Sequence, residues 1–521
     1  MPQKGTKKHK KTDLAMVQQK YRSSLTVQAF CLLVAKTLAF AFAFALPVLL
    51  TRSLSQNEYG LFKQVFLIIT TLTALLPLGF GMSAYYYLPR EQDLARRGQV
   101  ILNILLFNLV MGIVACLVLG FWPGLIGAIF RDPAMSSYAP LAGVVILLWL
   151  FSSFLETVAV ANQELRLATI FIVAGQLTRT ILLLAAAILF DSVAALIYAA
   201  MIHGVLQSLA LIWYASTRFP GFWRAFDKSL TLKQVAYALP FGMAGLLYTI
   251  QTDLHNYFVS HQFSAATFAV YSIGVAQLPF IGILRESVSS VMLPRISYLQ
   301  EQGLPREIVL LLASATRKLA VVILPVYAVL MVTGREFLTV MFTSTYAKSW
   351  PIFAINLTLL PLSLLDVDAV ARAYEGHRFF LVKLQIVLSI VMVLALWYCI
   401  GRFGLTGAIG VVVGINFVLR MLLVARFTRV IGAKLRDLVL LKDVGKIGLA
   451  STVAALSCLF VRTAMTGARP LVVLVVCFAA FGVIYLGAIL LLGVATTDER
   501  QKVRHGVARL QQLVYLGRSA S

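Results

Sequence analysis

Long apolar stretches alternate with short polar segments along nearly the whole chain, from about residue 25 to residue 494. A helix of about 20 apolar residues crosses the hydrocarbon core of a bilayer. The pattern therefore predicts an all-α integral membrane protein with fourteen transmembrane helices. The predicted spans are 25–50, 61–86, 99–121, 140–161, 168–190, 193–215, 233–259, 267–292, 308–333, 350–373, 379–400, 405–425, 445–466 and 470–494.

The lysines and arginines between these stretches fall almost entirely into alternate loops. Of the 45 Lys and Arg, 33 lie on the side that the two tails share, 8 lie on the other side and 4 lie inside spans. Positively charged loops mark the cytoplasmic side of a membrane protein. We therefore expect both termini in the cytoplasm. An even number of spans agrees with this, because it requires both termini to lie on one side of the membrane.

The composition supports a membrane protein rather than a soluble one, since 60% of the 521 residues are hydrophobic. A net charge of +24 would suggest nucleic acid as the partner of a soluble protein. Here no loop is long enough to hold a recognition module, so we expect no nucleic-acid partner. The positive charge instead holds the orientation of the chain and meets anionic membrane lipids.

A short internal repeat follows the first and the seventh predicted spans. Residues 54–62 and 263–271 share an apolar residue, Ser, three variable positions, an aromatic, a small, an aliphatic and an aromatic residue, in that order. Parallel repeats of this kind predict two pseudo-symmetric six-helix lobes plus two extra C-terminal helices. The expected parts are a basic tail at 1–24, an N-lobe at 25–215, a cytoplasmic loop at 216–232, a C-lobe at 233–425, two further spans at 445–494 and a basic tail at 495–521. The last tail is expected to form either an amphipathic helix on the membrane surface or a solvated segment.

Four basic residues lie inside the spans, where a charge is costly unless it faces a cavity or a partner. They are Lys36, Arg179, Arg285 and Arg420. Lys36 and Arg179 lie near the middle of the bilayer, which favours a role in a cavity. Arg285 and Arg420 lie nearer the ends of their helices, where snorkelling to the headgroups explains them equally well. Together they predict a cationic cavity for an anionic cargo, such as a phosphate.

Three titratable residues inside the spans are candidates for coupling to an ion: Asp253, His255 and Asp366. Each could bind a proton or a cation during transport, although Asp366 could equally pair with Arg372 or Arg420. The chain has no phosphate-binding loop, no zinc-protease motif and no nucleophile elbow. We therefore expect a transporter rather than an enzyme, with no metal or cofactor. Its energy would come from a proton or sodium gradient, from the membrane potential or from the gradient of the cargo.

Residues 50–62, Leu-Thr-Arg-Ser-Leu-Ser-Gln-Asn-Glu-Tyr-Gly-Leu-Phe, resemble the first-loop pattern of the oligosaccharide (O-antigen type) flippases. These proteins form the polysaccharide-transport branch of the multidrug/oligosaccharidyl-lipid/polysaccharide exporter superfamily. Residues 269–272, Ala-Val-Tyr-Ser, resemble the counterpart that opens the eighth span. The chain departs from the family at Ser55-Gln56, where Gly-Pro is frequent.

This resemblance implies an alternating-access flippase in the inner membrane of a bacterium. It would move a polyprenyl-pyrophosphate-linked oligosaccharide to the outer leaflet, for O-antigen, lipopolysaccharide or exopolysaccharide synthesis. The four intramembrane cations would bind pyrophosphate or acidic sugars. The motif residues Arg52, Tyr59 and Gly60 would belong to an outer gate, although Arg52 could equally cap the end of its helix. A polysaccharide polymerase and glycosyltransferases would be partners. The alternatives are a flippase for a lipid-linked peptidoglycan precursor, an ion-coupled multidrug exporter, or a membrane glycosyltransferase or polymerase.

Overall fold

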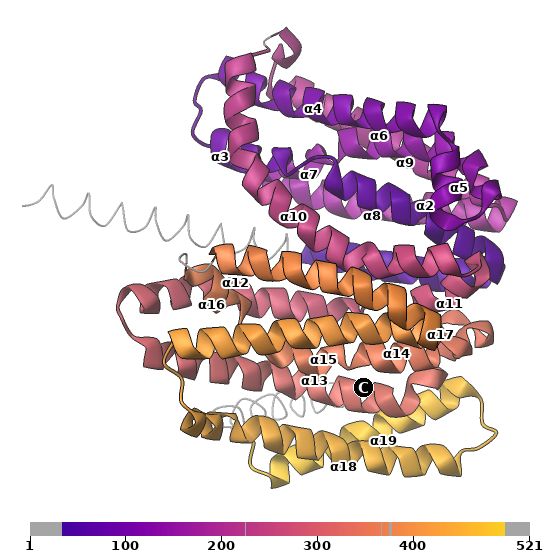
Figure 1. Cartoon of the computed structure of the whole chain (residues 1–521), viewed down its shortest axis with the longest axis vertical. Coiled ribbons are helices and arrows are strands. Elements are labelled where there is room, and N and C mark those ends of the chain that lie inside the picture. The colour runs from indigo at the N-terminus through magenta and orange to yellow at the C-terminus, as the bar shows by residue number, and fades with distance from the viewer. Residues whose placement is uncertain (1–33, 225, 366, 375–377, 495–521) are drawn as a thin grey trace, which may run out of the picture. The chain divides into compact units, whose positions relative to one another are not determined.

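The computed structural model describes residues 34–224, 226–365, 367–374 and 378–494, which form helices and no β-strand (Figure 1). Both predicted tails, at 1–24 and 495–521, lie outside these residues. The all-helical prediction is confirmed. Within the described residues, ten helices are long and apolar enough to cross a membrane, or eleven if one bent pair forms a single span.

The predicted number of fourteen spans is not confirmed by this count. One reason is that α17 (Arg378–Val430) is a single continuous segment, although its backbone breaks at Gly404 with a φ of 57°. Another reason is that α10 (Lys228–Gln262) and α12 (Pro279–Glu301) are absent from the ten apolar helices. Both carry polar and charged residues along their length.

The helices group by their contacts into two compact units, each of which has its own packing. Unit 1 contains the described residues up to 273 together with 277–280 and 385–408. Its helices are Val34–Ser53, α2 (Gln56–Leu75), α3 (Ser83–Tyr87), α4 (Leu94–Phe121), α5 (Gly124–Phe130), α6 (Ala139–Ser152), α7 (Phe154–Ala161), α8 (Leu165–Phe190), α9 (Val193–Arg218), α10 and α11 (Ala265–Gly274). The lobe boundaries expected from the sequence stay a prediction.

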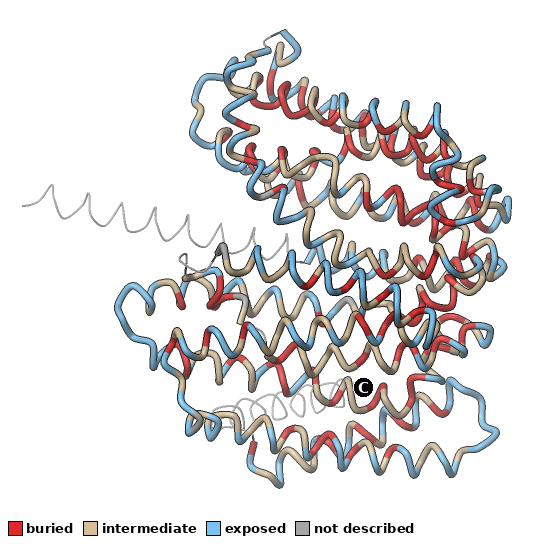
Figure 2. The backbone as a smooth tube through the Cα atoms, in the orientation of Figure 1, coloured by how far each residue is buried: buried red, intermediate tan, exposed pale blue. Residues whose placement is uncertain are grey.

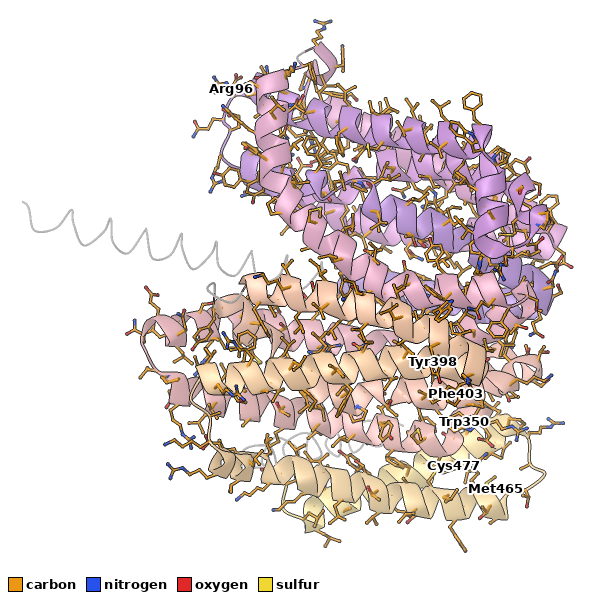
Figure 3. The ribbon with its side chains drawn as sticks, in the orientation of Figure 1. Arg96, Trp350, Tyr398, Phe403, Met465 and Cys477 are labelled. Carbon is orange, nitrogen blue, oxygen red and sulfur yellow. The ribbon has the colours of Figure 1, made fainter. Side chains whose placement is uncertain are left out.

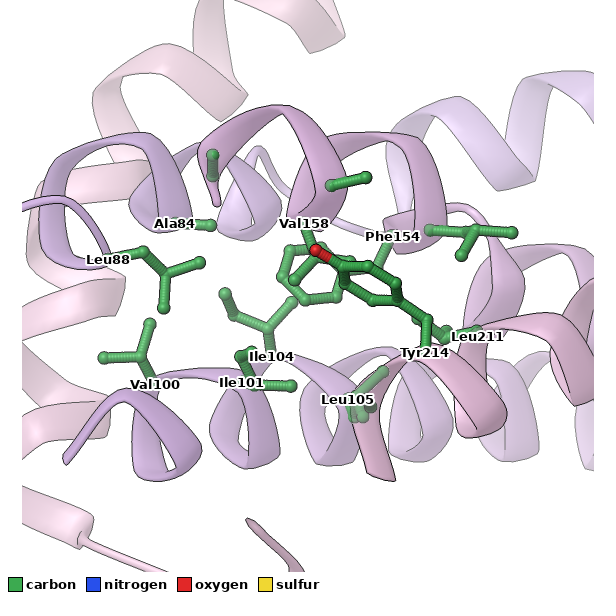
Figure 4. Packing of buried hydrophobic residues seen from close by; sticks show 14 of the residues in the cluster. Ala84, Leu88, Val100, Ile101, Ile104, Leu105, Phe154, Val158, Leu211 and Tyr214 are labelled. Atoms are coloured by element: carbon green, nitrogen blue, oxygen red, sulfur yellow. The ribbon is translucent and has the colours of Figure 1, made fainter. Parts of the chain in front are cut away.

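Buried residues in unit 1 lie where its helices meet, as the backbone coloured by burial in Figure 2 shows. Helix α4 packs on α6, and α9 packs on both α6 and α8. In one part of this core, Ile101 and Ile104 of α4 lie opposite Phe154 of α7, with Tyr214 of α9 beside them (Figure 4). Between helices in lipid, such contacts stabilise through close van der Waals packing rather than through removal from water.

A sharp bend separates α2 from the helical segment that follows it. The two directions differ by 43° at a break after Leu75, where Pro77 interrupts the helix and Gly79 has a φ of 70°. Gly242 of α10 packs directly against this break, since a Cβ at Gly242 would lie 2.0 Å from the carbonyl oxygen of Leu78. Two backbones therefore cross at a distance that only glycine allows.

A buried polar network fixes the first turns of α10 within unit 1. The Asn103 amide donates to Gln234 Oε1 at 2.9 Å, and Gln234 donates to Ser83 Oγ at 3.1 Å. Asp227 caps the helix, and the backbone N–H groups of Leu230 and Ser229, which donate to its carboxylate, hold the pKa of Asp227 below its ordinary value. Buried polar groups must be satisfied in this way, so the network specifies how α10 docks.

Unit 2 contains residues 274–276, 281–384 and 409–494 as far as the structure describes them. Besides α12 and parts of α17, its helices are α13 (Pro305–Phe342), α14 (Trp350–Leu357), α15 (Leu359–Leu362), α16 (Asp368–Ala373), α18 (Lys442–Ala464) and α19 (Pro470–Leu491). Trp350, which Figure 3 labels, begins α14 and packs on Gly334 of α13, where a Cβ would lie 2.0 Å from the indole ring. Helix α13 also packs against both α18 and α19.

Large apolar side chains cover much of the outside of the helices. Leu491 of α19 is 89% exposed, and Phe460 of α18 is 77% exposed. Exposed apolar surface on this scale is unfavourable in water and is normal for helices that face lipid. Together with the ten apolar helices, it identifies a multi-pass membrane protein.

Candidate functional site

The two copies of the sequence repeat lie in contact in the structure. Ser55 caps α2 through a reciprocal pair of bonds with Glu58, and Ser264 occupies the same place before α11, where its Oγ accepts from the backbone of Thr267. The repeat therefore marks two equivalent helix starts. Side chains at matching positions in the two copies are buried: Tyr59 and Phe268, Phe62 and Tyr271.

Gly60 makes the closest contact between these two helix starts. A Cβ on Gly60 would lie 1.9 Å from the carbonyl oxygen of Ala265, so only a glycine fits. Beside it, Gln56 Nε2 donates to the carbonyl of Ala266 at 2.9 Å. Of the predicted gate residues, Gly60 and Tyr59 thus lie in this contact region, whereas Arg52 is exposed at the end of helix Val34–Ser53.

Lys36, one of the predicted cavity cations, has an acidic partner. Its Nζ lies 3.3 Å from Glu156 Oε1, and the two side chains are 57% and 45% exposed. A half-exposed ion pair on helices of this type is typical of a water-lined surface rather than a lipid-facing one. The Lys36 ammonium is therefore partly neutralised by the Glu156 carboxylate, which the sequence analysis left without a role.

Arg179 lies among four helices of unit 1, with Trp149 at their centre. Its guanidinium carbon is 4.4 Å from the centroid of the Trp149 ring, a cation–π contact. The indole N–H donates to the carbonyl of Ala200 on α9 at 3.0 Å, and Phe66 of α2 meets the ring edge-on. His203 of α9 also meets the ring edge-on, 5.9 Å between centroids.

The other two predicted cations, Arg285 and Arg420, belong to unit 2. Arg285 lines a cavity of about 30 Å³ between α12 and α13, together with Ser289, Thr316 and apolar side chains such as Met292. A volume of this size holds one or two water molecules. Arg420 is partly buried on α17, where the neighbouring Asn416 amide donates to its own helix at Val412.

The three ion-coupling candidates do not form one site among the described residues. Asp253 Oδ2 accepts a hydrogen bond from Thr71 Oγ1 of α2 at 2.9 Å. His255 Nδ1 lies 2.8 Å from the hydroxyl of Tyr271 on α11, so it faces a different helix. Asp366 lies outside the described residues. Metal-ligating clusters of three or more His, Cys, Asp or Glu are absent from the part of the chain that the structure describes.

Sequence reasoning missed several side chains that surround these residues. Lys63 is one of the eight basic residues that the sequence assigns to the side opposite the tails. It lies in the third turn of α2, partly buried, with its Nζ 5.6 Å from the centroid of Tyr59. Trp149 and His203 carry no signal in sequence, because one aromatic and one histidine in apolar helices usually pack as core residues. The spacing of Lys63 from Ser55, two turns along one helix, could have placed it inside the bundle.

Protein-family models identify the family to which this chain belongs. A family model described as "Polysaccharide biosynthesis protein" matches residues 49–351, more than half of the chain and the whole of both repeat copies. The chain belongs to this family. No curated protein sequence matches the chain. The family assignment confirms the predicted link to polysaccharide biosynthesis.

Several solved structures are similar to this member of the family in fold. The structure titled Lipid II flippase MurJ, inward closed conformation, has a TM-score of 0.66 at 15% identity, covering 87% of this chain and 97% of that one. An inward-facing multidrug resistance transporter matches with a TM-score of 0.57 at 15% identity, covering 76% and 95%. A mutant multidrug transporter of Vibrio cholerae matches with a TM-score of 0.51 at 15% identity, covering 78% and 98%. The chain therefore shares the fold of these solved structures.

Proposed function

We propose that the protein is a flippase that moves a polyprenyl-diphosphate-linked oligosaccharide from the inner to the outer leaflet of the bacterial cytoplasmic membrane. The observation that carries this proposal is an arginine, Arg285, beside a water-sized cavity in a chain of the polysaccharide biosynthesis family. A guanidinium at a hydrated position inside a helical unit suits the diphosphate of a lipid carrier, because it donates several hydrogen bonds and keeps its charge.

The chemistry of the neighbouring residues supports a diphosphate near Arg285. Ser289 and Thr316 line the same cavity and supply hydroxyl groups, while the remaining lining is largely apolar. A low-dielectric surrounding strengthens the attraction between a guanidinium and a phosphate. Arg420 on the second half of α17 adds a further cation to unit 2. Lys36 adds one to unit 1, although the Glu156 carboxylate partly neutralises its charge.

The contact between the repeat copies supports alternating access. Gly60 and Ala265 meet backbone to backbone at the starts of α2 and α11, where the family resemblance places the outer gate. We propose that this contact closes the outer side while cargo binds, and that it opens when cargo leaves. Asp253 or His255 would couple a proton or sodium gradient to that change, and the polymerase and glycosyltransferases of the same pathway would supply and use the cargo.

The test is surface glycan in cells that depend on this protein. Arg285→Met should lower glycan display roughly tenfold or more, because the loss of a hydrogen bond to a charged group costs about 1.5–3 kcal/mol. Arg295→Met is the matched control, since Arg295 lies on the same helix α12 but is exposed. Normal display in the Arg285 variant, at equal protein level, would refute the assignment.

The same experiment separates the proposed cargo from a peptidoglycan precursor. Loss of a peptidoglycan precursor flippase stops growth, whereas loss of an oligosaccharide flippase removes surface glycan. Cells carrying Arg285→Met should therefore grow and lack glycan. A block in growth with glycan display intact would favour the peptidoglycan alternative.

A further inference from the structure

A cluster of basic side chains lies inside unit 1, apart from the cavity at Arg285. Arg179 of α8 and His203 of α9 lie against Trp149, and Lys63 lies on α2 three residues before Phe66, which meets the same ring. The positive charge of Arg179 acts on both Lys63 and His203. Each side chain comes from a different helix, and α9 packs on both α2 and α8. The cluster is therefore held together by the fold rather than by a flexible loop.

The described part of the chain offers no carboxylate to balance this cluster. Lys63 and Arg179 form no ion pair there, in contrast to Lys36 with Glu156 and Arg462 with Glu336. In addition, Arg179 Nε and His203 Nδ1 are buried without a hydrogen-bond partner among the described residues. Two like charges and two unsatisfied nitrogens at this depth are unfavourable unless something neutralises them.

The geometry of Arg179 leaves donors available for such a partner. A cation–π contact uses the face of the guanidinium, so the N–H groups in its plane remain free to point away from the Trp149 ring. The indole N–H already donates to Ala200, so it takes no part. Lys63 and Arg179 are only partly buried and keep some accessible surface, which the terminal nitrogens can offer to a ligand.

We propose that Lys63, Arg179 and His203 bind a small inorganic anion of the chloride class inside unit 1. One negative charge between the ammonium and the guanidinium offsets their repulsion and supplies the missing acceptor. The buried nitrogen atoms show that packed side chains close one side of the cluster. A monatomic halide needs far less room than a diphosphate with a lipid and a glycan attached.

Thermal unfolding of the purified full-length protein tests this proposal. The midpoint should be higher in sodium chloride than in sodium gluconate at equal ionic strength, by about 2 °C or more. Arg179→Met should lose that difference. Arg402→Met is the matched control, because Arg402 also lies over an aromatic ring, Tyr398, but is exposed, and it should keep the difference. Equal midpoints of the natural protein in both salts would overturn the proposal.

Iodide quenching of tryptophan fluorescence gives a second readout that needs no change to the cationic residues. Iodide quenches an indole that it touches, so a bound iodide should quench Trp149 at low concentration. Trp149→Phe should lose this saturable phase, and excess chloride should suppress it in the natural protein. A purely linear quench that is the same with and without Trp149 would contradict a site at this place.

Comparing halides with polyprenyl diphosphate shows which of the two anions binds at this cluster. If the site takes a small inorganic anion, chloride and bromide alone stabilise the protein, and polyprenyl diphosphate adds the same stabilisation to the natural protein and to Arg179→Met. If only the polyprenyl diphosphate acts through Arg179, and halides have no effect, the cluster belongs to the cargo site and the proposal is wrong. The measurements with halides do not depend on what the protein transports. They therefore test the anion site independently of the flippase proposal.

Discussion

Substitution of Gly60 tests the contact between the two repeat copies. The structure leaves no room for a side chain there, because a Cβ on Gly60 would lie 1.9 Å from the Ala265 carbonyl oxygen and 2.4 Å from its carbon. Real Cβ contacts with backbone atoms do not occur below 3.0 Å. Gly60→Ala therefore requires the start of α2 to move away from the start of α11.

The expected size of the effect follows from the cost of overpacking. Forcing extra atoms into a packed contact costs about 1–3 kcal/mol. This cost applies only to the conformation in which the contact is closed, so it shifts the population towards the open conformation by roughly 5- to 150-fold. Elsewhere in a helix, Gly→Ala is favourable by about 1 kcal/mol, so the sign at this position should be the opposite of the ordinary one.

The matched control is Gly245→Ala in α10 of the same unit, where no atom lies within 4 Å of the added Cβ. The assay is the labelling rate of Gln56→Cys by a maleimide, in purified protein whose native cysteines are replaced. In the closed contact the residue at position 56 lies against Ala266. Gly60→Ala should accelerate labelling at least fivefold, and Gly245→Ala should leave it unchanged. Equal rates in the two variants would refute the closed contact.

Three further predictions concern charges. Lys36→Glu and Glu156→Lys should each impair surface glycan, and the double exchange should restore it in part, as measured in the same cells. Arg462→Met should lower the free energy of unfolding by about 3 kcal/mol, because it leaves the largely buried carboxylate of Glu336 without its cation, and denaturant titration checks this. The lowered pKa of Asp227 means that its cap stabilises α10 above the ordinary carboxyl pKa of 3.8 and is lost as the pH falls through the lower folded-state value. Asp227→Asn, which keeps an acceptor, should remove that acid dependence of the thermal midpoint.

Much of the architecture could be predicted, because the order of apolar and polar residues along the chain determines where helices form in a membrane protein. Apolar stretches of membrane-spanning length and the repeat at 54–62 and 263–271 are visible without coordinates, and both copies do begin helices at Ser55 and Ser264. The number of spans was not confirmed. Helix α10 of unit 1 carries too many polar residues to count as an apolar span. One of these residues, Gln234, holds α10 in place through its hydrogen bond to Ser83.

The partners of the intramembrane charges could not be predicted for a physical reason. Helices such as α6 are apolar on all sides, so their sequence does not say which face meets a neighbour. The pairing of Lys36 with Glu156 and the stacking of Arg179 on Trp149 depend on how those helices are rotated and crossed. The position of a charge within a span could thus be inferred, but its contacts could not.

The most direct test of the flippase proposal is transport in liposomes of defined composition. Purified protein would be reconstituted with a fluorescent polyprenyl-diphosphate oligosaccharide, and a membrane-impermeant quencher would report how fast the lipid of the inner leaflet reaches the outside. The natural protein should make that lipid accessible far faster than protein-free liposomes do, and Arg285→Met should slow it about tenfold. A rate equal to that of protein-free liposomes, in protein shown to be folded, would contradict the proposed function.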